Sequence, residues 1–364
     1  HSIEFSSQSA LTKLLHPVQV RIHGPVVQDF VYNFIQRWNH AKLANNSVRK
    51  RYIMVFPSST GSGSGLGSSS PISRLPLSQS IASVMESSSS LLDTMSASSS
   101  SSSSLENSAS GSTNIDPASL NYTCNCQVVR SVTDWSAGVP TENSIYKAML
   151  GTPISSRELS LSLTLTHSNR VIDDHIYQAK HYIYIENQYF ISCVYSTVPK
   201  NKVAFALYHR IRRAILRGET FRVYAFIPTF PAVNVNNHDA HIIKWVYKTI
   251  NRKKTSLLQL LAAEFPHVAL DEYISFYSLR TWDRTDACVG DEYLTEQVYI
   301  HSKLMIVDDL VAIIGSANIN DRSMRGSRDS ELSVVIQDKL LVPNDMNGVS
   351  VLVGKAVLAL RLRL

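Results

Sequence analysis

The chain has 364 residues, of which 44% are apolar, and a formal net charge of +6 at pH 7. The length allows one large domain or two ordinary ones, and the apolar fraction suffices for a buried core, which excludes a wholly disordered chain. No window of eighteen or more uninterrupted apolar residues is present, so the sequence predicts no membrane-spanning segment.

Residues 1–57 are expected to fold. Apolar residues between Val26 and Trp38 recur at steps of three and four, which predicts a helix. From residue 58 to 119 serine dominates, and too few apolar side chains are present to offset a backbone ordering cost of about 1–2 kcal/mol per residue. We therefore expect a disordered linker there. Its net charge is −3, so the rest of the chain carries +9, which favours anionic lipid, phosphate esters or nucleic acid as partners, or serves solubility alone.

From residue 120 onward, strand-like and helix-like segments alternate. Apolar, β-branched runs predict strands at residues 126–130, 182–185, 221–227, 298–307, 311–314 and 332–336. Helical periodicity predicts helices at residues 171–180, 202–217, 241–250 and 256–265. A second polar stretch, 152–169, is expected to loop out. The alternation predicts an α/β fold, a mixed sheet flanked by helices on both faces.

The cysteines and the N-terminus bear on location. Cys124, Cys126, Cys193 and Cys288 form neither a C-x-x-C pair nor a zinc-type set, so we expect reduced thiols, no metal and a cytoplasmic protein. No basic region followed by an apolar run opens the chain, so no secretory signal is expected. The first residue is not methionine, which suggests a fragment of a longer protein.

The segment that ends at Asn318 has the spacing H-x-K-x4-D-x6-G-S-x-N. Its first part is apolar and β-branched, so we predict a strand on which His301 and Lys303 project from one face, about 7 Å apart at the backbone. Asp308 follows at the turn into the next strand, which ends near Ser316 and Asn318. The pattern therefore predicts one site with an imidazole, an ammonium and two neutral hydrogen-bonding groups.

These groups suit chemistry at a phosphoryl centre. Histidine can attack phosphorus or pass a proton to a leaving oxygen, and a lysine ammonium is a fixed positive charge for a phosphoryl oxygen. A carboxylate on the distal imidazole nitrogen would hold the ring, and Glu331 is the candidate for that role. A His-x-Lys pair alone is more often a satisfied histidine beside a lysine with a buried stem, so the longer spacing carries the prediction.

The H-x-K-x4-D segment and its extension from Gly315 to Glu331 resemble the HKD signature of the phospholipase D superfamily, and the eukaryotic phosphatidylcholine-hydrolysing phospholipases D in particular. Segments 34–39, 130–138 and 185–192 are similar to further blocks of the same lipases. The resemblance implies that residues 1–57 end an N-terminal catalytic half and that residues 120–364 form a C-terminal half with one HKD motif.

The resemblance also implies a phospholipase D-like α/β/α fold of two halves, each with one HKD motif. It implies hydrolysis of phosphatidylcholine to phosphatidate and choline, or transfer to primary alcohols, through a phosphohistidine intermediate. The first-half histidine would be the nucleophile and His301 the general acid and base. The implied protein is peripheral on cytoplasmic membranes and has neither a cofactor nor a nucleic-acid partner.

Three features are open to two interpretations each. Trp135 and Asn187 are candidates for the substrate pocket, or else a core anchor and a turn cap. A basic cluster on the helix predicted at 202–217 could meet anionic lipid, although a solvated face is the simpler interpretation. Its members are Arg210, Arg212, Arg213 and Arg217.

Only one half-site is present in this sequence. His40-x-Lys42 is the only other H-x-K pair, and Ser47 stands where its aspartate would be. The second histidine is expected from a first half of the same protein or from a second copy. Two alternatives stay open: another branch of the superfamily, a nuclease or a phospholipid synthase, and an inactive or binding fragment. A nuclease should carry denser lysine and arginine around the site.

Overall fold

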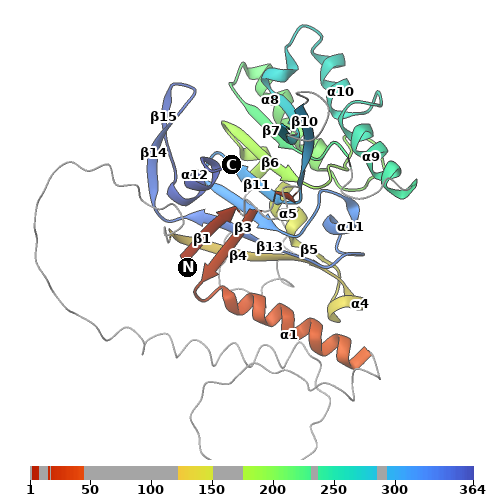
Figure 1. Cartoon of the computed structure of the whole chain (residues 1–364), viewed down its shortest axis with the longest axis vertical. Helices are drawn as coiled ribbons and strands as arrows, with labels where there is room; N and C mark the ends of the chain where they lie inside the picture. The colour runs from red at the N-terminus through yellow and green to blue at the C-terminus, as the bar shows by residue number, and fades with distance from the viewer. Residues whose placement is uncertain are drawn as a thin grey trace, which may run out of the picture. The chain divides into compact units, whose positions relative to one another are not determined.

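A mixed sheet organises the protein (Figure 1). This computed structural model describes residues 2–7, 15–16, 18–44, 122–150, 175–230, 237–284 and 293–364. The predicted linker at 58–119 and the predicted loop at 152–169 lie outside these ranges. The strands run in the order β3-β1-β4-β13-β12-β11-β6-β7-β8, and β5 pairs with β4. Neighbours are antiparallel as far as β6 and parallel from β6 to β8.

The strands of this sheet are β1 (Ser2–Ser7), β3 (Val18–His23), β4 (Tyr122–Val132), β5 (Glu142–Asn143), β6 (Tyr182–Asn187), β7 (Arg222–Phe226), β8 (Ile274–Tyr277), β11 (Lys303–Val307), β12 (Val311–Gly315) and β13 (Glu331–Asp338). Two smaller sheets are built from β2 (Leu15–His16), β9 (Leu279–Arg284), β10 (Tyr293–Ile300), β14 (Leu341–Met346) and β15 (Val349–Gly354). The helices are α1 (Val27–Ala44), α4 (Asp134–Ala137), α5 (Ser144–Leu150), α7 (His175–Gln178), α8 (Val203–Arg217), α9 (Asn237–Ile250), α10 (Leu257–Glu264), the 3-10 helix η2 (Leu270–Glu272), α11 (Asp321–Met324) and α12 (Lys355–Arg361).

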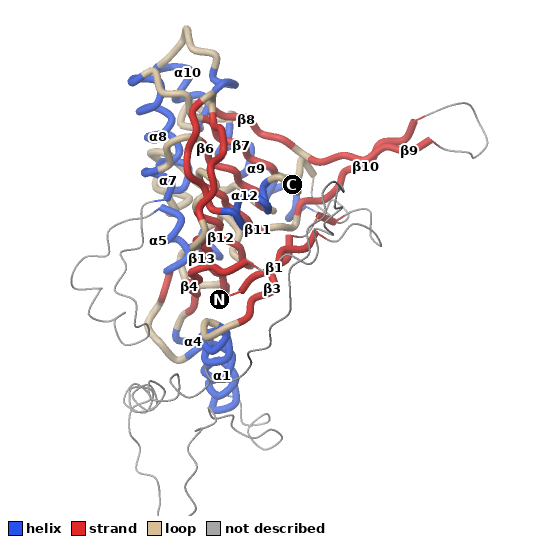
Figure 2. The backbone as a smooth tube through the Cα atoms, turned by 90° about the vertical axis from the view of Figure 1, so that its left-hand side faces the viewer, coloured by secondary structure: helices blue, strands red, loops and turns tan. Residues whose placement is uncertain are grey.

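The central strands are buried on both faces because successive side chains point in opposite directions. On β11, Met305 and Val307 join one core, while Leu304 and Ile306 join the other. Figure 2 shows α5, α7, α8 and α10 along one face of the sheet, and their apolar residues belong to the first core. Residues of α12 belong to the second core. Each fully buried side chain of this size contributes about 1.5–3 kcal/mol, so both faces stabilise the sheet, and the predicted α/β architecture is confirmed.

The predicted strand at 298–307 is wrong as one continuous element. β10 ends at Ile300 and β11 begins at Lys303, and the two pair with different neighbours. His301 and Ser302 lie in the break, where the Ser302 Oγ accepts a hydrogen bond from the Val18 N–H at 3.0 Å. The break frees His301 from strand pairing, so it is exposed while Ser302 is buried.

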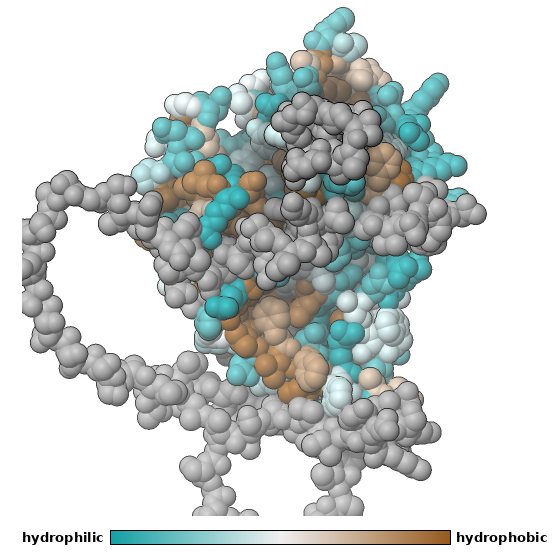
Figure 3. Space-filling model, viewed as in Figure 1, coloured by the Kyte–Doolittle hydropathy of each residue, from teal (hydrophilic) through white to brown (hydrophobic). Residues whose placement is uncertain are grey.

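Exposed apolar side chains gather over β14 and β15 (Figure 3). Leu341 and Val349 lie on the two strands of the hairpin, and Leu352 is 62% exposed. Since these side chains face outward, the hairpin contributes little to either core. None of the helices among the described residues combines the length and apolarity needed to cross a bilayer.

Gly315, the last residue of β12, is a position where the backbones approach too closely for a side chain. A Cβ there would overlap the Ser333 Oγ and the Leu332 carbonyl on β13. We expect Gly315→Ala to lower the free energy of unfolding by about 3 kcal/mol, because the two strands must separate. Gly218→Ala is the control, since open space surrounds that glycine and only its positive φ is strained, at about 1 kcal/mol. Urea denaturation of both variants tests the difference, and equal losses would contradict it.

Candidate active site

Most of the predicted site residues lie at one end of the strands of the sheet, which we call the active edge. The strand directions bring the ends of β4, β12, β6, β7 and β8 to the same edge as the beginnings of β11 and β13. Around this edge lie His301, Lys303, Ser316, Asn318, Glu331, Asn187 and Trp135. Segments far apart in the sequence therefore supply a single region of the surface.

Lys303 is held beside the backbone of His301. Its Nζ donates hydrogen bonds to the His301 carbonyl at 2.6 Å and to the Gln188 Oε1 at 3.1 Å. No hydrogen bond joins the His301 ring to another part of the described chain. The ring is therefore available to a ligand, and the ammonium lies close to it.

The pKa values of both groups are lowered. Burial lowers the pKa of Lys303 to about 8, against the opposing effect of the Glu331 charge. Burial, and then the positive charge of Lys303, lower the pKa of His301 below its usual value. At pH 7 the site in the free protein therefore holds a largely neutral imidazole next to an ammonium, the pairing that an anionic phosphoryl group would bind.

Glu331 makes contacts other than the predicted one with His301. Its two carboxylate oxygens accept hydrogen bonds from the Ser316 Oγ at 2.5 Å and the Ser323 Oγ at 2.6 Å. The predicted hydrogen bond to the imidazole is absent from the described contacts. Glu331 instead anchors the loop after β12 to the start of β13 and supplies negative charge near Lys303.

Ser316 and Asn318 both line the active edge, but they differ in their hydrogen bonds. The Ser316 Oγ, besides donating to Glu331, accepts from the Leu332 N–H at 3.1 Å. The Asn318 Oδ1 is buried and has no hydrogen-bond partner among the described residues. A buried polar atom without a partner is costly, so Asn318 offers a ready contact for a bound molecule.

Asn187, a predicted candidate for the substrate pocket, has a structural role instead. It is 1% exposed, and its Oδ1 accepts from the N–H of Tyr189 at 3.2 Å and of Ile319 at 3.0 Å. These bonds fasten the turn after β6 to the loop that carries Asn318. Trp135 is 61% exposed on α4, so the interpretation as a core anchor is wrong, and its contact with substrate stays a prediction.

Asp308 lies at the opposite end of β11 from Lys303, about 16 Å away at the rise of a strand. Its carboxylate accepts hydrogen bonds from the N–H groups of Lys180 at 2.6 Å, His181 at 2.8 Å and Tyr182 at 2.8 Å. The prediction that Asp308 belongs to the catalytic group is therefore wrong. In the structure Asp308 anchors the β11–β12 turn to the start of β6.

Gln188 was not singled out from the sequence. Besides receiving Lys303, its Nε2 donates to the hydroxyls of Tyr299 at 3.1 Å and Tyr189 at 3.3 Å. Lys303 pairs with Asn187 in the register of β11 and β6, so Gln188 follows directly after the partner of Lys303. Only that pairing could have identified it, because neither composition nor spacing marks this glutamine.

The fold and the edge define a class of protein: an α/β protein whose histidine and lysine are arranged for a phosphoester. No group of three or more His, Cys, Asp and Glu in the described part of the chain is placed to hold a metal ion.

Comparison with known proteins agrees with this class. The family model described as "Phospholipase D" matches residues 85–350. The chain is 45% identical over 243 residues to Phospholipase D B of Dictyostelium discoideum, covering 66% of this chain and 18% of the relative. It is 34% identical over 395 aligned positions to Phospholipase D zeta 2 of Arabidopsis thaliana, covering 95% and 35%. It is 33% identical over 355 positions to human Phospholipase D1, covering 96% and 26%.

The chain belongs to the phospholipase D family. It spans between 18% and 35% of the length of these three relatives.

Proposed function

We propose that this chain supplies one of the two histidine half-sites of a phosphodiesterase that hydrolyses phosphatidylcholine to phosphatidate and choline. The observation that carries the proposal is the proximity of the exposed His301, whose imidazole makes no hydrogen bond to the described part of the chain, and the fixed ammonium of Lys303 at the sheet edge. Family membership and the names of the relatives support this activity.

The proposed mechanism has two steps. A histidine of the other half-site attacks phosphorus, the bond from phosphorus to the choline oxygen breaks, and His301 gives its proton to that oxygen. Water then attacks the phosphohistidine, passes a proton to His301 and releases phosphatidate. In the free protein His301 is largely neutral at pH 7, and a bound phosphate anion raises its pKa, so proton uptake accompanies binding.

Each of the neighbouring groups has a part in this scheme. The Lys303 ammonium stabilises charge on the phosphoryl oxygens, and Gln188 keeps it in place. The amide nitrogen of Asn318 can donate to a phosphate oxygen, and its unpaired Oδ1 can accept from a water molecule. A primary alcohol can replace water in the second step, which gives transfer of the phosphatidyl group.

The proposed partners are a membrane surface and a second half-site. The net charge of +9 outside residues 58–119 favours anionic phospholipid, and we place the protein in the cytoplasm, peripheral on membranes. The second histidine comes from a first half of the same protein or from a second copy of this chain.

The pKa of Lys303 predicts an alkaline limit to activity. The ammonium loses its charge as the pH rises through about 8, so kcat/KM should fall there. Lys303→Arg keeps a positive charge at every pH used and should remove this fall, although its different shape lowers the rate. The pH profiles of kcat/KM for both enzymes test this expectation. A fall near pH 8 that survives in Lys303→Arg would assign it to another group.

The proposal is tested by phosphatidyl transfer from labelled phosphatidylcholine to a short primary alcohol. The chain is assayed alone and in a longer protein that contains both half-sites. Product from the chain alone means that two copies supply the two histidines, and product from the longer protein only means that the first half is required. A correctly folded longer protein that forms no phosphatidylalcohol would overturn the proposal.

A further inference from the structure

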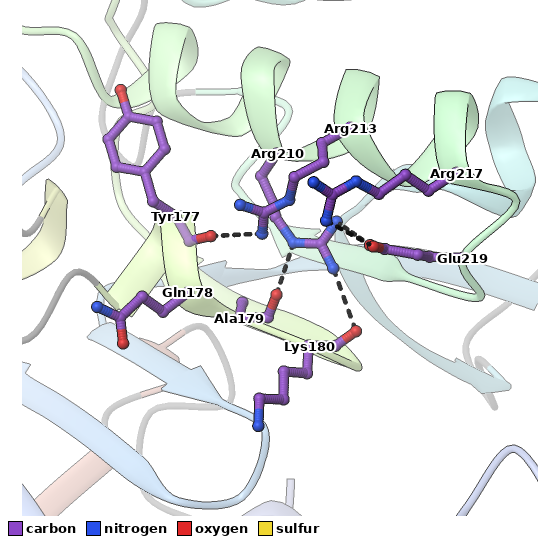
Figure 4. A pocket seen from close by; sticks show the side chains of 8 residues that line it. All are labelled: Tyr177, Gln178, Ala179, Lys180, Arg210, Arg213, Arg217 and Glu219. Atoms are coloured by element: carbon purple, nitrogen blue, oxygen red, sulfur yellow. Dashed lines mark hydrogen bonds and ion pairs between the residues drawn. The ribbon is translucent and has the colours of Figure 1, made fainter.

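A basic cavity of about 400 Å³ opens beside α8, away from the active edge (Figure 4). Its charged lining consists of Lys180, Arg210, Arg213, Arg217 and Glu219. Four basic residues and one acidic residue thus line the cavity. The cavity lies where α8 ends and β6 begins, whereas the His301 edge is where β6 ends.

Arg210 is a structural part of this cavity. It is 2% exposed, its Nε donates to the Ala179 carbonyl at 2.6 Å, and its Nη2 donates to the Lys180 carbonyl at 3.2 Å. The guanidinium also packs over the Phe221 ring, and its Nη1 is 3.0 Å from the Glu219 carboxylate. Arg210 thereby holds the residues after α7 in place and takes up most of the negative charge available.

Arg213 and Arg217 are left with little compensation. The Arg213 Nη2 donates to the Tyr177 carbonyl at 2.5 Å, but its Nε is buried and has no hydrogen-bond partner in the described chain. The Arg217 Nη1 reaches Glu219 only at 3.5 Å, and that side chain is 66% exposed. Figure 4 shows the Arg210 and Arg217 guanidinium groups directed at the single carboxylate and the Arg213 guanidinium directed at the Tyr177 carbonyl, with the Lys180 amine pointing away from them.

The arrangement is unfavourable without an anion. Burial, and then the nearby charge of Arg213, lower the pKa of Arg210. Bonds to the carbonyls of Tyr177, Ala179 and Lys180 account for Arg210 and for one nitrogen of Arg213, but the Arg213 Nε has no partner in the described chain and Arg217 has only its long contact with Glu219. Planar guanidinium groups bind phosphate oxygens in pairs, and a cavity of this volume is in the range of small-ligand sites.

We propose that this cavity binds a phosphate-bearing anion through Arg213 and Arg217, on a frame made by Arg210 and Glu219. The ligand is a phosphorylated headgroup, carried either by a membrane lipid or by a soluble phosphoester. The loop after α7 forms one wall of the cavity, and it donates two of the three N–H groups that hold Asp308, the third being that of Tyr182 at the start of β6. The binding site is separate from His301 and does not depend on the proposed catalysis.

The test is a calorimetric titration with two probes. Inorganic pyrophosphate represents a soluble phosphoester, and phosphatidylcholine vesicles that contain phosphatidate represent a lipid. Both are titrated into chains that also carry Lys303→Ala, so that binding at the active edge is weakened. Arg213→Gln is compared with Arg212→Gln, which removes the same charge one residue away. Arg212 is the matched control because it pairs with Glu264, at 2.6 Å, outside the cavity.

We expect Arg213→Gln to weaken at least one probe about tenfold or more, and Arg212→Gln to change it less than twofold. Loss with pyrophosphate identifies a soluble source, and loss with vesicles alone identifies a lipid. Equal losses in the two variants, or none in Arg213→Gln, would overturn the proposal.

A second measurement covers a variant that fails to fold. Phenylglyoxal modifies exposed arginines, and mass spectrometry locates the modified residues in the unaltered chain. We expect pyrophosphate or the phosphatidate vesicles to protect Arg217 and to leave Arg212 reactive. Absence of selective protection by both probes would contradict the site.

Discussion

Replacement of His301 with alanine, in a protein that contains both half-sites, is expected to lower phosphatidylcholine hydrolysis about 10³-fold or more. The proposed role is to protonate the departing choline oxygen and then to accept a proton from water, and a positioned acid–base group contributes about 10²–10⁴-fold to such a step. Lys303 and the Gln188 that holds it remain in the variant, so substrate binding should change much less than kcat.

The measurement is the initial rate of choline release from vesicles. His267→Ala serves as the control, because that histidine is exposed in the turn after α10. Thermal unfolding of both variants checks that the fold is intact. If His301→Ala kept more than a few per cent of the activity, another group would have to carry the proton.

The sheet and its long helices could be predicted because their signals are local. β12 and β13 are apolar on both faces, and the amphipathic pattern of α8 buries Leu207 and Ile211. Such periodicities depend only on neighbouring residues in the chain. The α/β class follows from their alternation.

The arrangement around His301 could not be predicted, because its causes are distant in the sequence. The strand is interrupted where Ser302 accepts a hydrogen bond from Val18, 284 residues away. Likewise the carboxylate of Glu331 is satisfied by Ser316 and Ser323, so it does not reach the imidazole. Alternation along an assumed continuous strand placed His301 and Lys303 beside each other, as they are in the structure, but it did not predict the residues that contact them.

Asp308 shows how a spacing can identify a family and yet mislead about a contact. The four residues between Lys303 and Asp308 form the rest of β11, so the carboxylate lies at the opposite end of this strand from the lysine. The carboxylate is 5% exposed there and the residue has a φ of 52°. Its work is therefore to fix the β11–β12 turn, and through that turn the strand that begins with Lys303.

Asp308→Ala is accordingly expected to act on stability. The change removes the acceptor of three backbone N–H groups. It also places alanine, which lacks the polar side chain that makes a positive φ tolerable for aspartate, at this position. We therefore expect the free energy of unfolding to fall by about 4 kcal/mol. Asp308→Asn is the matched control, because asparagine tolerates this backbone conformation and keeps one acceptor oxygen, and it should lose about half as much.

Urea denaturation of the two variants measures these losses, and kcat at a temperature where both stay folded measures the remaining activity. A structural role requires that folded Asp308→Asn keep most of the kcat and the fall in kcat/KM near pH 8, since Lys303 and Gln188 are about 16 Å away. A variant of unchanged stability that had lost kcat would return Asp308 to the chemistry. The aspartate and the histidine of one motif would thus have separable functions, one in holding the strand and the other in moving the proton.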